Sequence, residues 1–139
     1  MHDFSARIHS LYFDKDYNCA RTILICLCEK AGIELTQQTL DAAIGMHGAG
    51  RFRAQCGLVE GTLMALGICG SVRGLPPKSI AALCFSFAEQ FTARFGSLLC
   101  RELRPQGFQP SDPPHACEGL TNEASVFAAT FMETNLPHA

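Results

Sequence analysis

The longest helical pattern in the chain does most to limit its fold. Between residues 80 and 95, apolar side chains recur at the steps of an amphipathic helix; they are Ile80, Leu83, Cys84, Phe87, Phe91 and Phe95. Pro76 and Pro77 mark the entry to this helix, and Gly96 interrupts it. The pattern therefore predicts one long helix with an apolar stripe on one side.

The same spacing predicts helices along the rest of the chain. We expect them at about residues 2–13, 19–31, 36–45, 56–68 and 120–134, with a short helical turn around residues 100–103. Asn18 is a suitable N-cap for the second helix, and Gly32 is a plausible C-cap. Residues 45–50 hold three glycines and residues 105–114 hold four prolines, so both stretches are expected as loops. The sequence thus predicts an all-α, single-domain bundle of five or six helices over residues 1–139.

Small residues recur every four positions in the helix expected at 56–68. Gly57, Gly61 and Ala65 make one side of it almost flat, so that another backbone can approach closely. This explains glycines that would otherwise cost about 1 kcal/mol each relative to alanine. The flat side can serve packing within the monomer or the seam of a homodimer.

Composition and charge exclude several classes of protein. The chain has 139 residues and is 47% hydrophobic, enough for a conventional core. Its net charge is -2 and its basic residues form no run, which argues against nucleic acid as a partner. Residues 1–5 lack the basic and apolar stretches of a signal peptide, so we expect a cytoplasmic protein. The longest apolar stretches fall well short of the roughly 18 residues of a membrane span, so we expect no membrane association.

Eight cysteines stand out in a chain of this kind. A cytoplasmic location argues against permanent disulfide bridges, and it favours metal binding or transient redox chemistry. Four of the cysteines, Cys19, Cys56, Cys100 and Cys117, sit in distinct local settings at expected helix starts or loops. None of these four belongs to a short CxxC pair. Any site that they share must therefore be assembled by the fold.

The order of these motifs resembles a known family. Tyr17-Asn18-Cys19-Ala20, a glycine-rich loop, Cys56-Gly57-x-x-x-Gly61, Phe95-Gly96-Ser97-x-x-Cys100 and a downstream cysteine follow one another as in the C_GCAxxG_C_C family of redox-active proteins. The resemblance spans roughly residues 11–131. It implies a small helical protein, related to a helical module that accompanies haem in split-Soret cytochromes, with its motif cysteines at Cys19, Cys56, Cys100 and Cys117. This chain departs from the family at Leu58, where alanine is common, and in its extra cysteines.

The chemistry of the four cysteines depends on thiolate, and hence on a lowered pKa. Cys56 is the first candidate, because a helix N-terminus and the upstream Arg51 and Arg53 would favour its anion. Cys19 also lies at a helix start, so Cys19 and Cys56 are the candidate catalytic thiols. Together they could form a redox disulfide or supply two metal ligands. With Cys100 and Cys117 they complete a four-thiolate set for an iron–sulfur cluster or another metal.

The remaining cysteines are expected mainly in the core, where free cysteine behaves as a small hydrophobe. Cys84 lies inside the phenylalanine stripe. Cys26 shares a helix side with Cys19 and is either a spare ligand or, by preference, a packing residue, whereas Cys28 points to the opposite side. Cys69, beside a glycine at a helix end, is left undecided.

Two histidines and the glycine-rich loop offer weaker signals. His47 and His115 could complete a mixed metal site, although we expect both to face solvent. The loop at 45–50 lacks the Lys-Ser/Thr of a P-loop and a preceding strand, which argues against nucleotide binding.

The sequence therefore predicts a redox module that carries electrons through a cluster or cycles a dithiol, with a redox protein as its partner. The alternative is a structural zinc-binding or helical protein-interaction module with no redox role. A true thiol-oxidoreductase enzyme would need a substrate pocket, which the sequence does not disclose.

Overall fold

The computed structural model describes residues 2–104, 111–112 and 115–138. Helices dominate this part of the chain, with a single isolated antiparallel bridge between Gln55 and Leu99. The helices are α1 (Ser5–Phe13), α2 (Cys19–Lys30), α3 (Gln37–Ala42), α4 (Gly48–Arg51), α5 (Gly57–Val72), α6 (Pro77–Phe95), α7 (Cys100–Leu103) and α8 (Glu118–Asn135). The all-α class is confirmed. Eight helices in the described residues exceed the predicted five or six, because α4 and α7 are four-residue turns.

Helix α2 forms the centre of the molecule. All of its residues from Ala20 to Cys28 except Arg21 are buried, so it is enclosed on nearly every side. Its start follows the prediction, since the side chain of Asn18 accepts a hydrogen bond of 2.9 Å from the backbone N–H of Arg21. Because nearly all of α2 is shielded from water, its position is set by the helices packed around it.

Helix α5 packs directly against the backbone of α2. A Cβ atom on Gly61 would lie 2.5 Å from the carbonyl oxygen of Ala20 and 2.5 Å from a methyl carbon of Ile23. A Cβ atom on Gly57 would lie 3.0 Å from the backbone nitrogen of Ala20 and 3.1 Å from Cβ of Cys19. The flat glycine side thus serves packing within the chain. Since later residues of α5 meet later residues of α2, the two helices run in the same direction.

The end of α5 differs from the prediction. We expected this helix to end near residue 68, but it continues to Val72. Gly70 is buried, and a Cβ atom on it would lie 2.8 Å from a side-chain carbon of Ile80 in α6. The glycine therefore permits close packing between two helices instead of ending one.

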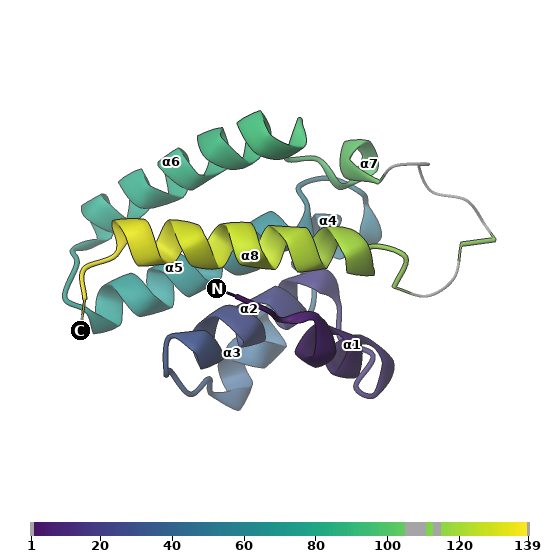
Figure 1. Ribbon diagram of the computed structural model, residues 1–139, viewed down its shortest axis with the longest axis horizontal. Helices are drawn as coiled ribbons and strands as arrows, with labels where there is room; N and C mark the ends of the chain where they lie inside the picture. Colours follow the sequence, from purple (N-terminus) through teal and green to yellow (C-terminus); the bar gives the residue numbers. More distant parts are fainter. Residues whose placement is uncertain (1, 105–110, 113–114, 139) are drawn as a thin grey trace.

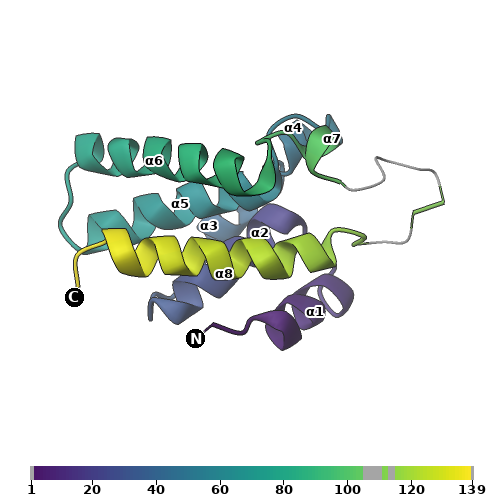
Figure 2. The same cartoon turned by 45° about the horizontal axis from the view of Figure 1, so that its top comes forward.

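Helices α6 and α8 close the bundle around a group of phenylalanine rings. Phe87 and Phe91 of α6 are fully buried, as the apolar stripe predicted. The ring of Phe87 lies 5.4 Å from that of Phe131 in α8, and the ring of Phe95 lies 5.6 Å from that of Phe127. Figures 1 and 2 show α8 lying between α6 and α1.

None of the helices in the described ranges combines the length and the apolar character that a bilayer-spanning segment requires.

The contact between α2 and α5 predicts opposite effects for two glycines in the same helix. Gly61→Ala should lower the free energy of unfolding by about 1–2 kcal/mol, because the overpacking against Ala20 outweighs the gain in helix propensity. Gly67→Ala, where a Cβ would meet nothing within 4 Å, should raise it by up to about 1 kcal/mol. Urea unfolding measures both. Equal stability of the two variants would contradict the close packing.

Candidate functional site

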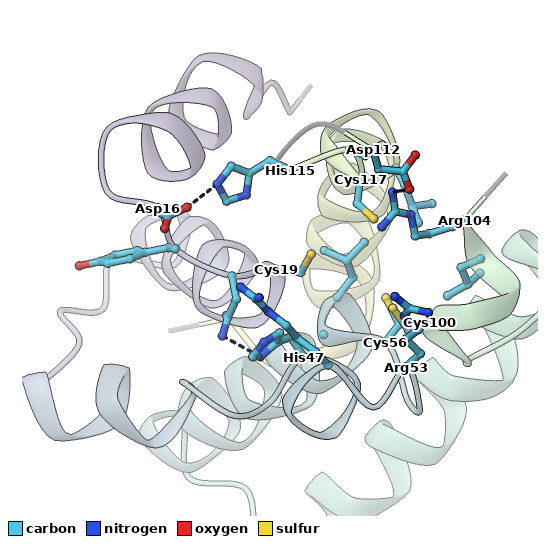
Figure 3. A pocket seen from close by; sticks show the side chains of 18 residues that line it. Asp16, Cys19, His47, Arg53, Cys56, Cys100, Arg104, Asp112, His115 and Cys117 are labelled. Carbon is cyan, nitrogen blue, oxygen red and sulfur yellow. Dashed lines mark hydrogen bonds and ion pairs between the residues drawn. The ribbon is translucent and has the colours of Figure 1, made fainter. Parts of the chain in front are cut away.

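One pocket of about 570 Å³ is lined by all four motif cysteines, Cys19, Cys56, Cys100 and Cys117 (Figure 3). They come from four separate parts of the chain, and the fold brings them to one place. The pocket is also lined by cationic and anionic side chains; these are Arg51, Arg53, Arg104, Asp16 and Asp112. The structure thus assembles the residues that the sequence singled out.

Each of the four cysteines lies at the beginning of a helix. Cys19 is the first residue of α2, and Cys100 is the first residue of α7. Cys56 is the N-cap of α5, and Cys117 is the N-cap of α8, where the sequence had predicted only a proline-rich loop. The long helices α2, α5 and α8 therefore present their N-terminal ends at the pocket. Unpaired N–H groups and the positive ends of the helix dipoles favour thiolates there.

Cys56 and Cys100 are held together by backbone pairing. The N–H of Cys56 donates to the carbonyl of Leu98 at 2.8 Å, and the N–H of Cys100 donates to the carbonyl of Ala54 at 2.7 Å. The isolated bridge described above lies between these two bonds. A short piece of strand-like backbone in a helical protein thus places these two thiols beside one another.

Cys19 and Cys117 form the other pair. The two thiols lie close enough for a hydrogen bond between them to shift both pKa values, upward for Cys19 and downward for Cys117. The hydroxyl of Tyr12 lies 3.3 Å from the Cys19 sulfur and 2.6 Å from the hydroxyl of Thr121. Thr121 in turn lies 2.9 Å from the carbonyl oxygen of Cys117. These contacts connect α1, α2 and the start of α8.

Tyr12 is a site residue that the sequence analysis did not single out. Its side chain is buried in α1, and burial raises its pKa, so the phenol stays protonated and remains a hydrogen-bond donor. In the sequence, only the residue type could have indicated this role for Tyr12. A tyrosine on the inward side of a helix, unlike a phenylalanine, needs a partner for its hydroxyl.

Within this pair, Cys117 is the acidic thiol. The hydrogen bond from Cys19 lowers the pKa of Cys117 to about 7, and the charge of Arg104 acts in the same direction, whereas burial and Asp112 raise it. The pKa of Cys19 is raised well above its usual value by the same hydrogen bond and by burial. Near neutral pH, Cys117 is therefore partly thiolate and Cys19 is its proton donor.

The expectation that Cys56 has a lowered pKa is wrong. Cys56 is only 5% exposed, and burial raises its pKa to about 12. The backbone N–H groups of Leu58 and Val59 lower the pKa, as expected at a helix start, but desolvation outweighs them. Burial likewise raises the pKa of Cys100, against the opposing charges of Arg104 and Arg53.

Both histidines line the pocket and are partly buried, whereas we expected them to face solvent. The imidazole Nε2 of His115 lies 2.8 Å from a carboxylate oxygen of Asp16, and its ring stacks on Tyr12 at 4.6 Å. His47 Nδ1 lies 3.0 Å from the side-chain nitrogen of Asn18, and burial lowers the pKa of His47. Each histidine thus contacts another residue that lines the pocket.

The glycine-rich stretch predicted as a loop forms a left-handed turn. Residues 48–51, which make up α4, all have positive φ, between 56° and 71°. Two of these residues, Ala49 and Arg51, are not glycine, and such residues rarely adopt this conformation. The turn carries Arg51 to the pocket, and Arg53, which also has a positive φ of 66°, follows it.

The other cysteines lie away from this pocket. Cys26 is buried in a separate cluster with Ile8 and Leu11, which agrees with a packing role. Cys84 is partly buried against the main core, as the phenylalanine stripe predicted. Cys28 and Cys69, to which the sequence analysis assigned no specific role, are both fully buried.

The pocket cysteines are arranged as two pairs and not as one group of metal ligands. Across residues 2–104, 111–112 and 115–138, no group of three or more His, Cys, Asp or Glu side chains is placed to hold a metal ion. In this conformation, the four pocket thiols are not placed to bind one metal ion together.

The pairing predicts how Cys117 reacts. Its alkylation by iodoacetamide should rise with pH around a midpoint near 7, because only the thiolate reacts. Cys19→Ala removes the hydrogen bond, so the pKa of Cys117 should rise and alkylation at pH 7 should fall about tenfold. The carboxyl-terminal tryptic peptide holds Cys117 as its only cysteine, so mass spectrometry can follow it.

A second substitution should shift the pKa of Cys117 in the opposite direction. Asp112→Asn removes a charge that raises the pKa of Cys117, so its midpoint should move to lower pH. A profile that Cys19→Ala leaves unchanged would contradict the pairing.

Comparison with curated proteins and with solved structures gives no match. One family model does match, over residues 17–131, and its description is "Putative redox-active protein (C_GCAxxG_C_C)". The matched region covers most of the chain and contains all four pocket cysteines. The chain therefore belongs to the C_GCAxxG_C_C family of redox-active proteins.

Proposed function

We propose that this protein is a dithiol redox protein in which Cys19 and Cys117 cycle between two thiols and a disulfide. The observation that carries the proposal is that both thiols line one open pocket, are linked through Tyr12 and Thr121, and lie close enough for each to shift the pKa of the other. A thiolate with a neighbouring thiol is the arrangement needed to attack a disulfide and then resolve the product.

The proposed reaction is exchange with the disulfide of a partner. The Cys117 thiolate attacks one partner sulfur, the partner S–S bond breaks, and the other partner sulfur becomes a thiolate, while the attacked sulfur stays bonded to Cys117 in a mixed disulfide. Cys19 then loses its proton to that thiolate and attacks the Cys117 sulfur, which forms the Cys19–Cys117 disulfide and releases the second partner thiolate. Two electrons have passed from the dithiol to the partner, whose two cysteines end reduced.

The surroundings of the pair fit these steps. Tyr12 can donate its hydroxyl proton in a hydrogen bond to the Cys19 sulfur, which stabilises the thiolate while it forms. Arg104 favours the Cys117 thiolate from the pocket wall. A volume of about 570 Å³ lies in the range of pockets that take a small molecule, so the disulfide of a small compound or of a protruding loop could enter. A redox protein is accordingly the proposed partner.

A metal-thiolate centre is the second candidate. The observation that favours it is that all four motif cysteines line one pocket, and four thiolates are the usual ligand set of an iron–sulfur cluster. Such a cluster would supply one-electron transfer. In this structure the cysteines stand as two pairs, so ligation by all four would require the pairs to move toward one another.

One preparation distinguishes these functions. The protein is purified without oxygen, and its iron, sulfide and zinc contents are measured together with its visible absorbance. It is then treated with oxidised glutathione, alkylated and digested with trypsin. For a dithiol protein we expect no stoichiometric metal, and we expect a disulfide link between the peptide of residues 16–21, which holds Cys19, and the carboxyl-terminal peptide.

Cysteine variants identify the two sulfurs that form the disulfide link. Cys19→Ser and Cys117→Ser should each abolish the link, whereas Cys84→Ala, which lies outside the pocket, should leave it intact. Iron and sulfide in cluster proportions would instead support the metal centre, and colourless protein with one zinc would support a structural role. A link formed by Cys56 in place of Cys117 would support the original assignment of Cys56 and overturn the proposed pair.

A further inference from the structure

Two cysteines outside the family motif, Cys28 and Cys69, meet in the core. Both have no exposed surface, both belong to the main core cluster, and each thiol shifts the pKa of the other. Cys28 lies in the last turn of α2, and Cys69 lies in the last turn of α5. Neither lines the pocket of the four motif cysteines. They form a separate pair at the other end of the same two helices.

The register of α2 and α5 explains why these sulfurs meet. The backbones touch where Gly61 packs on Ala20. Cys28 follows Ala20 by eight residues, and Cys69 follows Gly61 by eight residues. Since the helices run in the same direction, equal steps of about two turns lead to positions that are again opposite. Ala65, halfway along α5, is also small and fully buried, so the close approach continues.

We propose that Cys28 and Cys69 are a second redox site, which oxidises to a disulfide that joins α2 to α5 inside the core. The geometry needed for such a bond is a short distance between two backbones with side chains that face one another. The glycine contact supplies the first condition, and the equal eight-residue steps from it, which lead to two fully buried thiols of one core cluster, supply the second.

A peroxide is the oxidant that fits a buried pair, because it is small enough to reach the core during local opening. The Cys69 sulfur, as thiolate, attacks one peroxide oxygen; the O–O bond breaks, water leaves after protonation, and Cys69 becomes a sulfenic acid. The Cys28 sulfur then attacks the Cys69 sulfur, the S–O bond breaks, and a second water leaves with the Cys28 proton. Two thiols are oxidised to one disulfide, and hydrogen peroxide is reduced to two waters.

The roles of the two sulfurs follow from their surroundings. The hydrogen bond from Cys28 lowers the pKa of Cys69, and Arg73, the C-cap of α5, adds to this, whereas burial opposes it. The same hydrogen bond and burial raise the pKa of Cys28. Cys69 is thus the attacking sulfur and Cys28 the resolving one.

Such a bond would affect the two helices that carry pocket residues. It would cross-link the C-terminal ends of α2 and α5, whose N-terminal ends carry Cys19 and Cys56. The inference does not rest on the proposed chemistry of Cys19 and Cys117.

Peptide mapping of the full chain tests the bond. The protein is treated with hydrogen peroxide, free thiols are alkylated under denaturing conditions, and trypsin digestion follows. We expect a disulfide link between the peptide of residues 22–30 and that of residues 54–73. Because these peptides also contain Cys26 and Cys56, fragment spectra must assign the link to Cys28 and Cys69. If both remain open to alkylation, or if either is linked elsewhere, the proposal is overturned.

Thermal unfolding gives an independent measurement. A cross-link that closes a long loop should raise Tm by about 10 °C, and dithiothreitol should reverse the rise. The double variant Cys19→Ser/Cys117→Ser should keep this rise, which separates the core pair from the pocket pair. Cys28→Ala and Cys69→Ala should lose it, while Cys84→Ala should not. If the alanine variants at the core pair do not fold, the peptide map of the unsubstituted chain decides the question. An unchanged or lower Tm in linked protein would contradict a bond that fits the native register.

Discussion

The close contact between α2 and α5 is the interaction on which the rest of the structure depends. Gly57 and Gly61 let the backbone of α5 lie against that of α2 at Ala20, where any side chain would collide with it. Because the helices run in the same direction, this one contact fixes both of their ends. At the N-terminal ends it places Cys19 and Cys56 at the pocket, and in the last turns it places Cys28 opposite Cys69.

At the pocket, helix N-termini lower the pKa of a cysteine whereas burial raises it, and the balance differs from one cysteine to the next. Every motif cysteine begins a helix, so each sits where backbone N–H groups favour an anion. Cys56 is nonetheless held protonated, because desolvation dominates, whereas Cys117 gains a thiol donor and a nearby guanidinium. A helix start by itself does not make a reactive cysteine; what decides the pKa is whether another group replaces the lost water.

The pocket combines two pairs produced by different means. Backbone hydrogen bonds hold Cys56 beside Cys100, and side-chain contacts that involve Tyr12 hold Cys19 beside Cys117. Membership in a redox-active family and an all-helical frame are consistent with chemistry on sulfur. The pairwise arrangement is what directs the proposal to a dithiol, and the shared pocket is what keeps a metal-thiolate centre as the second candidate.

The sequence by itself determined the helices, their approximate bounds and the cysteines of interest, because periodicity, caps and glycine spacing are local properties of the chain. It also showed that α5 has a flat side, although not which helix covers it. Only the tertiary structure decided that Cys117 pairs with Cys19, that Tyr12 takes part, and that Cys56 is the less acidic thiol. Those outcomes depend on burial and on hydrogen bonds between residues about a hundred positions apart, such as Tyr12 and Thr121, which no local pattern records.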